Sequence, residues 1–206
     1  MLRPEGPLRG ARVLVTAGPT FEDLDPVRFI GNRSSGRMGY AIAAEAVRRG
    51  AHVALVTGPT AIEPPDVADI VRVRSAVEMH RAVLDRADRA DVVIMAAAVA
   101  DYAPADPVDQ KISKTGDTLT VSLKRNPDIL EDLGRRRLAT GRSPILIGFA
   151  AETEDVVARA RAKRERKHAG EEEQRQHHGS EVGGGRQASI DGSARHDRGH
   201  RDHRQG

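Results

Sequence analysis

Apolar residues form short runs that alternate with segments of helical spacing through most of the chain. The runs "RVLVTA" (12–17) and "HVALVT" (52–57) are rich in β-branched residues, and each is followed by Gly-Pro-Thr. This pattern predicts two strands that end in turns. Between them, over 36–50, small and apolar residues recur at helical spacing and Gly50 follows the last of them. That spacing predicts a helix ending near Gly50.

The same alternation continues further along the chain. Residues 70–102, "IVRVRSAVEMHRAVLDRADRADVVIMAAAVADY", predict a short strand, a helix and a buried strand, and 144–153, "PILIGFAAET", predict another buried strand before a helix over 154–167. Alternating strands and helices of these lengths are typical of an α/β fold, with a doubly wound, mainly parallel, Rossmann-like sheet. Ligands in such sheets bind at the carboxyl ends of the strands, so we expect 18–20, 58–60, 97–101 and 149–153 to gather there.

Two segments depart from this alternation. "KISKTGDTLTVSLKRNPDIL" (111–130) predicts a β-arm that turns around 115–117, followed by a helix that Pro127 begins. After Lys167 the chain is rich in Arg, His, Glu and Gly and has almost no large apolar residue. Such a segment cannot bury enough surface to offset its ordering entropy, so we expect disorder over 168–206. A metal-binding or nucleic-acid-binding tail is disfavoured because its His and Arg lack ligand-like spacing.

Composition narrows the class of protein. The length of 206 residues suits one domain, here 11–167 after a leader or linker at 1–10. No apolar run approaches the ~20 residues of a membrane span and no signal peptide is evident, which predicts a cytoplasmic protein that contacts no membrane. Cysteine is absent, so a cysteine nucleophile and thiolate metal sites are excluded. The formal charge of +3 does not indicate nucleic-acid binding.

The segment "GNRSSGRMG" (31–39) precedes the first predicted helix and admits two interpretations. Ser34 or Ser35 could cap the helix, or the same free N–H groups could bind a phosphate. Asp101, at the end of a strand, could cap a loop or meet a hydroxyl or a metal-bound phosphate. Lys111 in "KISK" could protect a solvated edge or neutralise a triphosphate.

A dinucleotide-dependent oxidoreductase is disfavoured. The Gly spacing after the first strand is wrong for a dinucleotide turn. Short-chain dehydrogenases need a Tyr with a Lys four residues later, but Ala44 follows Tyr40 at that spacing and Asp106 follows Tyr102. The residues for hydride transfer are therefore missing.

Taken in order, the motifs "TAGPTFEDLDPVRFIGNRSSGRMGYAIA", "AAAVADY", "KISK", "KRNPDIL" and "GFAAET" resemble phosphopantothenate-cysteine ligase (phosphopantothenoylcysteine synthetase), the C-terminal half of the bacterial bifunctional coenzyme A biosynthesis flavoprotein. The resemblance runs from about Arg12 to Lys167. It implies that CTP and Mg²⁺ activate the carboxylate of 4′-phosphopantothenate as an acyl-cytidylate, releasing pyrophosphate. Cysteine then displaces CMP.

The resemblance also implies roles for particular residues. Asn32 and Lys111 are implied to be catalytic. From the free N–H groups of the helix entrance we hypothesise that Ser34, Ser35 and Gly36 hold a phosphate or substrate. We hypothesise that Asn32 polarises the carbonyl of the mixed anhydride, because an amide can donate to an oxyanion without titrating. The residues implied to bind CTP are Met95, Ala96, Ala97, Asp101, Lys111, Pro127, Asp128, Ile129, Leu130, Phe149, Lys163 and Lys167.

The chain also departs from this family. The flavin-containing decarboxylase half does not precede it, so we expect no flavin here and a separate decarboxylase as a partner. Family members continue after the "KRERK" helix with an apolar strand, whereas "KHAGEEEQRQHH" stands here. We hypothesise a frameshift that removes the last strands and leaves an unpaired sheet edge. The resemblance implies a homodimer; the alternative to an active ligase is an inactive nucleotide-binding fragment.

Overall fold

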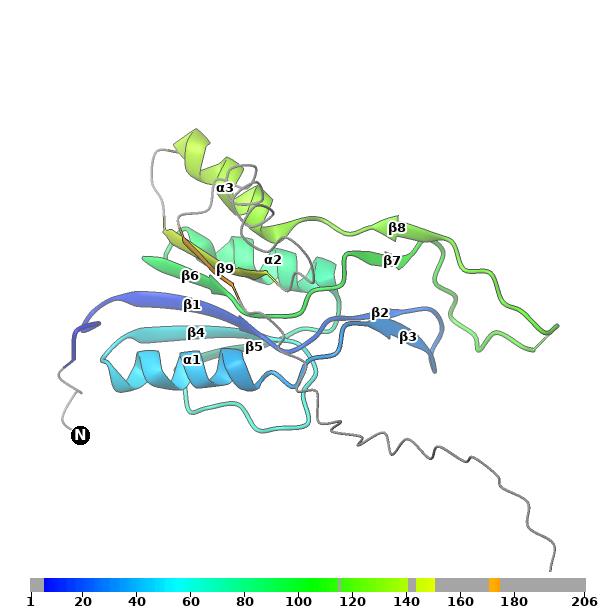
Figure 1. The fold of residues 1–206 in the computed structure, drawn as a ribbon, viewed down its shortest axis with the longest axis horizontal. Helices are drawn as coiled ribbons and strands as arrows, with labels where there is room; N and C mark the ends of the chain where they lie inside the picture. Colours follow the sequence, from blue (N-terminus) through cyan, green and yellow to red (C-terminus); the bar gives the residue numbers. More distant parts are fainter. Residues whose placement is uncertain (1–5, 115, 141–143, 151–170, 175–206) are drawn as a thin grey trace, which may run out of the picture.

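The computed structural model describes residues 6–114, 116–140, 144–150 and 171–174, and all structural statements below concern these residues. Their centre is a six-stranded parallel sheet in the order β10-β9-β6-β1-β4-β5 (Figure 1). This confirms the predicted doubly wound, Rossmann-like α/β fold. The strands are β1 (Arg12–Ala17), β4 (His52–Thr57), β5 (Asp69–Arg72), β6 (Val92–Met95), β9 (Ile145–Ala150) and β10 (Glu171–Gln174).

Helices cover both faces of the sheet because alternate residues of each inner strand point to opposite sides. Helix α1 (Arg37–Arg48) covers one face, and α2 (Ala76–Ala87) and α3 (Ile129–Thr140) cover the other (Figure 1). Within β1, Val13 and Val15 pack in the α1 cluster, whereas Leu14 packs in the cluster with α2 and α3. Two apolar cores therefore hold the central strands in register. None of the helices in the described ranges is long and apolar enough to cross a membrane.

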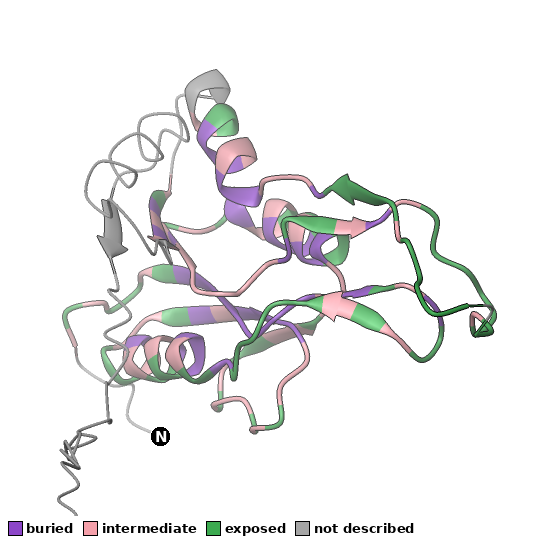
Figure 2. Ribbon diagram, turned by 45° about the vertical axis from the view of Figure 1, so that its right-hand side comes forward, coloured by how far each residue is buried: buried purple, intermediate pink, exposed green. Residues whose placement is uncertain are grey.

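Two antiparallel ribbons leave the sheet at its carboxyl edge (Figure 1). Strands β2 (Phe21–Asp23) and β3 (Phe29–Gly31) form one, and β7 (Tyr102–Pro104) and β8 (Leu123–Arg125) form the other. The chain between β7 and β8 is the arm, 105–122, and it is mostly exposed (Figure 2). The arm was predicted, with a turn around 115–117. Its paired strands, β7 and β8, lie further from these positions along the sequence than expected.

The β2–β3 ribbon was missed, since the sequence predicted a loop between the first strand and the first helix. Its strands are three residues long, too short to show alternation. The ribbon is stabilised instead by contacts between residues that are far apart in the sequence. The rings of Phe21 and Phe29 stack with their centroids 4.0 Å apart, and the Arg74 guanidinium lies 5.6 and 5.7 Å from them.

Residues 171–174 lie in the segment for which disorder was predicted, yet they form β10, which pairs in parallel with β9. β9 is therefore paired on both sides, and β10 is the outer strand at this edge of the sheet. The expectation that the last strands of the family are missing stays a prediction. The predicted helix over 154–167 and the rest of the tail lie outside the described residues.

Candidate functional site

The candidate site lies where β1 and β6 are neighbours. The chain leaves β1 toward α1 on one face and enters β6 from α2 on the other, so this is the point at which the sheet's winding reverses. Such switch points are where ligands bind in open α/β sheets. The loops that follow the two strands are joined directly, because Ala98 N donates to Gly18 O (2.9 Å) and Thr20 N donates to Ala98 O (3.3 Å).

Two buried threonines hold the loop that follows β6, residues 97–101. Thr16 Oγ1 accepts a hydrogen bond from Ala97 N (3.1 Å), and Thr20 Oγ1 accepts one from Ala100 N (2.9 Å). Both threonines are fully buried, and Thr16 Oγ1 also donates to Met95 Sδ (4.0 Å) at the end of β6. The turn 18–20 was expected at this edge, but the role of the Thr20 hydroxyl was not. Thr16 was missed, although a polar residue late in an otherwise apolar strand was the available signal.

Two asparagines hold the same loop from outside the sheet. Asn126, which is nearly buried, donates from Nδ2 to Ala100 O (2.8 Å) and from its backbone N to Asp101 O (2.8 Å). The exposed Asn32 donates from Nδ2 to Val99 O (2.8 Å). An amide nitrogen carries two hydrogens, so one N–H of Asn32 and its carbonyl oxygen remain for other partners. Each residue from 97 to 101 is thus held by a backbone or side-chain bond.

A cavity of about 130 Å³ opens beside this loop. It gathers seven of the residues that the resemblance implied for CTP binding: Met95, Asp101, Pro127, Asp128, Ile129, Leu130 and Phe149. Pockets that enclose a whole small ligand usually measure ~300–1,000 Å³. The cavity formed by the described residues is therefore smaller than a pocket that encloses a whole small ligand. Lys163 and Lys167, which the resemblance implied for the same site, lie outside the described residues.

The helix that begins at the cavity starts two residues later than predicted. α3 begins at Ile129 because Asp128 acts as its cap: Asp128 Oδ1 accepts from Glu131 N (3.1 Å), and Asp128 O accepts from Asp132 N (3.0 Å). Pro127 precedes the cap. The start of α3 packs closely on β9, since a Cβ at Gly148 would lie 2.8 Å from Leu130 Cδ2.

Phe149 borders the candidate site through its backbone. Gly148 faces Leu130 of α3, so the next side chain along β9 points to the opposite face. Phe149 accordingly also borders a cavity on the α1 side with Met38 and Ile42. The side chain thus lies on the α1 side, and the Phe149 backbone is what borders the candidate site.

The entrance to α1 has no side-chain cap. Gly36 is the N-cap with φ 76°, and Ser34 Oγ accepts from Gly36 N (3.3 Å) instead of capping the helix. The interpretation of Ser34 or Ser35 as an ordinary helix cap is therefore wrong. Gly36 is packed closely, because a Cβ there would lie 2.6 Å from Thr60 Cγ2 and 3.4 Å from Gly18 N. The turns at 18–20 and 58–60 meet at this point, as predicted.

Other expected residues do not line the cavity. Ala96 directly follows β6, Ala97 begins the loop 97–101, and Lys111 is exposed on the arm. In the part of the chain that the structure describes, no group of three or more His, Asp or Glu could hold a metal ion by itself. Asp101 and Asp128 both border the cavity. One or two carboxylates together with phosphate oxygens are the usual ligands of Mg²⁺, so these residues fit an ion that arrives with a nucleotide.

Larger cavities lie elsewhere. One of about 360 Å³ is at the opposite edge of the sheet, between β4 and α2, and it includes Arg12, His52 and Arg86. It contains none of the expected site residues. The cavity on the α1 side shares only Phe149 with them.

Comparison with known proteins agrees with this architecture. Residues 8–170 match the DNA/pantothenate metabolism flavoprotein C-terminal domain. The coenzyme A biosynthesis bifunctional protein CoaBC of Bacillus subtilis is 47% identical over 158 residues, which is 76% of this chain and 38% of that protein. CoaBC of Vibrio cholerae serotype O1 is 48% identical over 162 residues, 78% of this chain and 40% of that protein. The chain thus spans about two fifths of the length of these relatives.

A solved structure gives the same result. The crystal structure of the C-terminal domain of CoaBC superposes with a TM-score of 0.70 at 46% identity, covering 81% of this chain and 78% of that one. The match to the family extends over most of the chain and includes every strand of the central sheet except β10. The chain therefore belongs to the DNA/pantothenate metabolism flavoprotein C-terminal domain family.

Proposed function

We propose that this domain is a ligase of coenzyme A biosynthesis that joins 4′-phosphopantothenate to cysteine at the expense of CTP. A carboxylate oxygen of phosphopantothenate attacks the α-phosphorus of CTP, and pyrophosphate leaves. The cysteine amine then attacks the acyl carbon of the resulting acyl-cytidylate, losing a proton as CMP leaves. The observation that carries the proposal is the single cavity that gathers Met95, Asp101, the start of α3 and Phe149 at the sheet's switch point.

The fixed loop 97–101 supports a role in nucleotide binding. Its backbone is held by Thr16, Thr20, Asn32 and Asn126, so its free groups keep their positions before a ligand arrives. Preorganised dipoles stabilise developing charge without reorganising during the reaction. We assign the cavity to the cytidine part of CTP, with Asp101 serving the ribose or a bound Mg²⁺.

The triphosphate of CTP needs several cations, and the lining of the cavity supplies one, Arg125. We propose Lys111, Lys163 and Lys167 for the others, and Mg²⁺ would neutralise further phosphate charge. Lys111 is exposed on the arm, as a residue that meets a triphosphate from solvent would be. The uncapped entrance to α1, at Ser34, Ser35 and Gly36, is proposed to bind the phosphate of phosphopantothenate, because free N–H groups and the helix dipole favour an anion.

Asn32 is proposed to act in the second half of the reaction. It is bonded to the loop beside the cavity and keeps one N–H free, so that N–H can donate to the acyl carbonyl while Val99 O fixes the side chain. Asn32→Asp replaces this donor by a carboxylate facing Val99 O. We expect acyl-cytidylate to form and to accumulate in this variant, which mass spectrometry of the quenched reaction would detect. Normal amide formation with no trapped intermediate would contradict the role.

We further propose that the domain works as a homodimer and together with a flavin-dependent decarboxylase. Exposed apolar side chains on the two ribbons and the arm support self-association: Val27, Phe29, Tyr102, Val108, Leu119 and Leu123. Light scattering after gel filtration tests the first point, and a monomer at micromolar concentration would contradict it.

The second candidate function is a nucleotide-binding fragment that does not turn over. It is favoured by the segment after Lys167, which lacks the apolar strand expected of this family. One assay separates the two, namely release of pyrophosphate and CMP from CTP, phosphopantothenate and cysteine. Stoichiometric release of both supports the ligase, whereas CTP binding without either product supports the fragment.

A further inference from the structure

A buried carboxylate stands in an exposed part of the molecule. Asp25 lies in the turn between β2 and β3, yet it is only 2% exposed. Its Oδ1 accepts from Val27 N (2.9 Å) and Arg28 N (2.8 Å), which closes the turn on itself. A buried carboxylate is usually found with a partner that compensates its charge, and here that partner also reaches another part of the chain.

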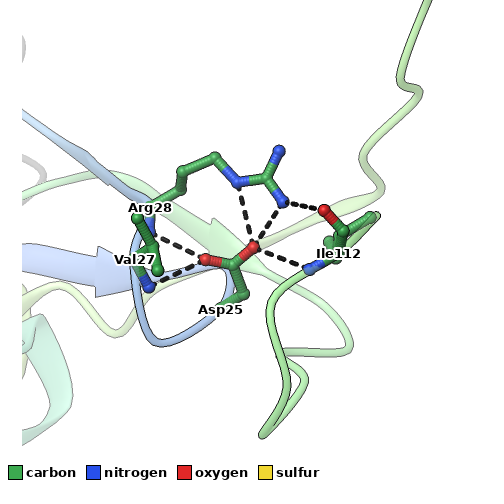
Figure 3. A network of polar contacts seen from close by, with 4 residues as sticks. All are labelled: Asp25, Val27, Arg28 and Ile112. Carbon is green, nitrogen blue, oxygen red and sulfur yellow. Dashed lines mark hydrogen bonds and ion pairs between the residues drawn. The ribbon is translucent and has the colours of Figure 1, made fainter. Parts of the chain in front are cut away.

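The second carboxylate oxygen of Asp25 connects the turn to the arm (Figure 3). Oδ2 accepts from Arg28 Nε (2.9 Å) and from Ile112 N (3.1 Å). The Arg28 guanidinium in turn donates from Nη2 to Ile112 O (2.9 Å). Asp25 and Arg28 thus hold both backbone polar groups of the residue that follows Lys111. We call this pair of contacts the clasp.

The clasp is the main attachment of this part of the arm. Besides it, Val108 N donates to Leu24 O (3.2 Å), again in the β2–β3 turn. Over the described residues of 106–114, these are the hydrogen bonds that the structure gives. The segment belongs to no strand or helix and is mostly exposed, so its position depends on the turn.

We propose that Asp25 is a positioning residue that fixes the Lys111 segment relative to the carboxyl edge of the sheet, an inference that rests on the proposed function of Lys111. A cation on a free loop must be ordered before it can bind a triphosphate, and that ordering opposes binding. The clasp orders the backbone beforehand. Four residues after Arg28 the same chain carries Asn32, which is bonded to the loop beside the cavity. The β2–β3 ribbon therefore connects Lys111 with the proposed second-step residue.

Asp25→Asn tests the clasp with almost no change in volume. One carboxylate oxygen becomes an NH₂ group, which is a donor instead of an acceptor. At the position of Oδ2 it would face Ile112 N–H and the Arg28 guanidinium. At the position of Oδ1 it would face the backbone N–H groups of the turn. Asp23→Asn is the matched control. Asp23 lies in the same ribbon and pairs with Arg74 (2.6 Å), so this variant removes a carboxylate–arginine pair that does not touch the arm.

The first measurement is amide hydrogen exchange of the full-length chain by mass spectrometry. We expect exchange over 108–112 to be about tenfold faster or more in Asp25→Asn, since loss of a hydrogen bond to a charged group leaves the segment free to open. Asp23→Asn is expected to exchange there like the unsubstituted chain. Unchanged exchange in Asp25→Asn would overturn the inference, whatever happens to CTP.

The second measurement is CTP affinity by calorimetry in the presence of Mg²⁺, in a double-mutant cycle with Lys111→Ala. If Asp25 acts through Lys111, Asp25→Asn weakens CTP binding about as much as Lys111→Ala does. The double variant then binds CTP about as weakly as Lys111→Ala alone. Additive losses, or an unaltered dissociation constant, would overturn the positioning role. A chain that binds no CTP at all would instead overturn the proposed function, while faster exchange in Asp25→Asn would still establish the clasp.

Discussion

At the scale of single residues, the candidate site depends on side chains that do not themselves carry reactive groups. Thr16, Thr20 and Asn126 are all buried or nearly so, and each forms a side-chain hydrogen bond to the loop 97–101. A loop fixed in this way presents its remaining groups in one arrangement. The motif residues proposed to bind substrate are therefore only part of the site, and we expect the residues that hold the loop to be as sensitive to substitution.

Thr20→Val tests one such support. The substitution keeps the shape but leaves the Ala100 N–H without its acceptor in a buried position, which costs about 1–3 kcal/mol. We expect this loss in the free energy of unfolding from urea titration. The exposed Thr118→Val is the control and should stay within about 0.5 kcal/mol. Equal stabilities for the two variants would show that Thr20 does not hold the loop.

Gly36→Ala tests the entrance to α1. The left-handed backbone at φ 76° costs a non-glycine residue about 1–2 kcal/mol. The added Cβ would also lie 2.6 Å from Thr60 Cγ2, and such overpacking costs about 1–3 kcal/mol more. Gly10→Ala is the control, because Gly10 has φ 80° but no atom within 4 Å of an added Cβ. Thermal unfolding should show the larger loss for Gly36→Ala, and equal losses would contradict close packing there.

Lys111 and Lys114 provide a comparison within one motif. Both are exposed on the arm, but only Lys111 is next to the residue held by Asp25 and Arg28. We expect Lys111→Ala to weaken CTP binding about tenfold or more, since preorganised charge at a phosphate is worth several kcal/mol. Lys114→Ala should change the dissociation constant by less than about threefold, because exposed charges contribute little. Equal effects in calorimetry would contradict a specific role for Lys111.

At the scale of elements, regular periodicity made most of the fold predictable. The strands β1, β4, β6 and β9 and the helix α1 were expected because their apolar positions repeat within a single segment. The β2–β3 ribbon was not, because Phe21 and Phe29 stack across a turn and Arg74 comes from a distant loop. Strands β7 and β8 likewise pair across 18 intervening residues, 105–122, which no local pattern reveals. Contacts between distant segments account for most of what the sequence did not predict.

The residues of the candidate site divide in the same way, into those that a local motif predicts and those that only contacts between distant segments reveal. The residues around the cavity were expected from their motifs, and the positions of their strand ends brought them together. The roles of Thr16, Thr20 and Asn126 were not expected, because their bonds to the loop 97–101 form only in the folded chain. The direction of the Phe149 side chain depends on the register of β9 against α3, which no sequence motif shows.

The clasp should depend on pH in a defined direction. The Arg28 guanidinium holds the pKa of the Asp25 carboxyl well below its ordinary value, against burial, with help from the backbone N–H groups of Val27, Ile112 and Arg28. Because the pKa is lower in the folded chain, the stabilisation is complete above the ordinary value of about 3.9 and is lost as the pH falls toward the folded value.

We therefore expect protection of the Ile112 amide, relative to Asp25→Asn, to be constant at neutral pH and to decline below about pH 4. Hydrogen exchange of both chains across this range measures the difference, and the comparison removes the intrinsic effect of pH on exchange. A difference that instead declines as the pH rises above neutrality would contradict this assignment of the charge.

At the scale of the whole molecule, the cavity beside the loop 97–101 lies at the carboxyl edge of the sheet. The two ribbons and the arm leave the sheet at the same edge (Figure 1). The arm and the cavity are connected by the β2–β3 ribbon, which touches the arm through Asp25 and the cavity loop through Asn32. This arrangement suits a reaction in two steps. The cavity would hold the nucleotide throughout, while groups on the ribbon and the arm act on the phosphates and then on the acyl carbon.

The central claim is that the domain joins its substrates through an acyl-cytidylate, and isotope transfer tests it most directly. Phosphopantothenate labelled with ¹⁸O in its carboxylate would be incubated with CTP, Mg²⁺ and cysteine, and the CMP analysed by mass spectrometry. Attack of the carboxylate on the α-phosphorus moves one of its oxygens to the nucleotide. The account predicts one labelled oxygen in each CMP and one in the amide product. Unlabelled CMP, or amide formed without CMP, would contradict it.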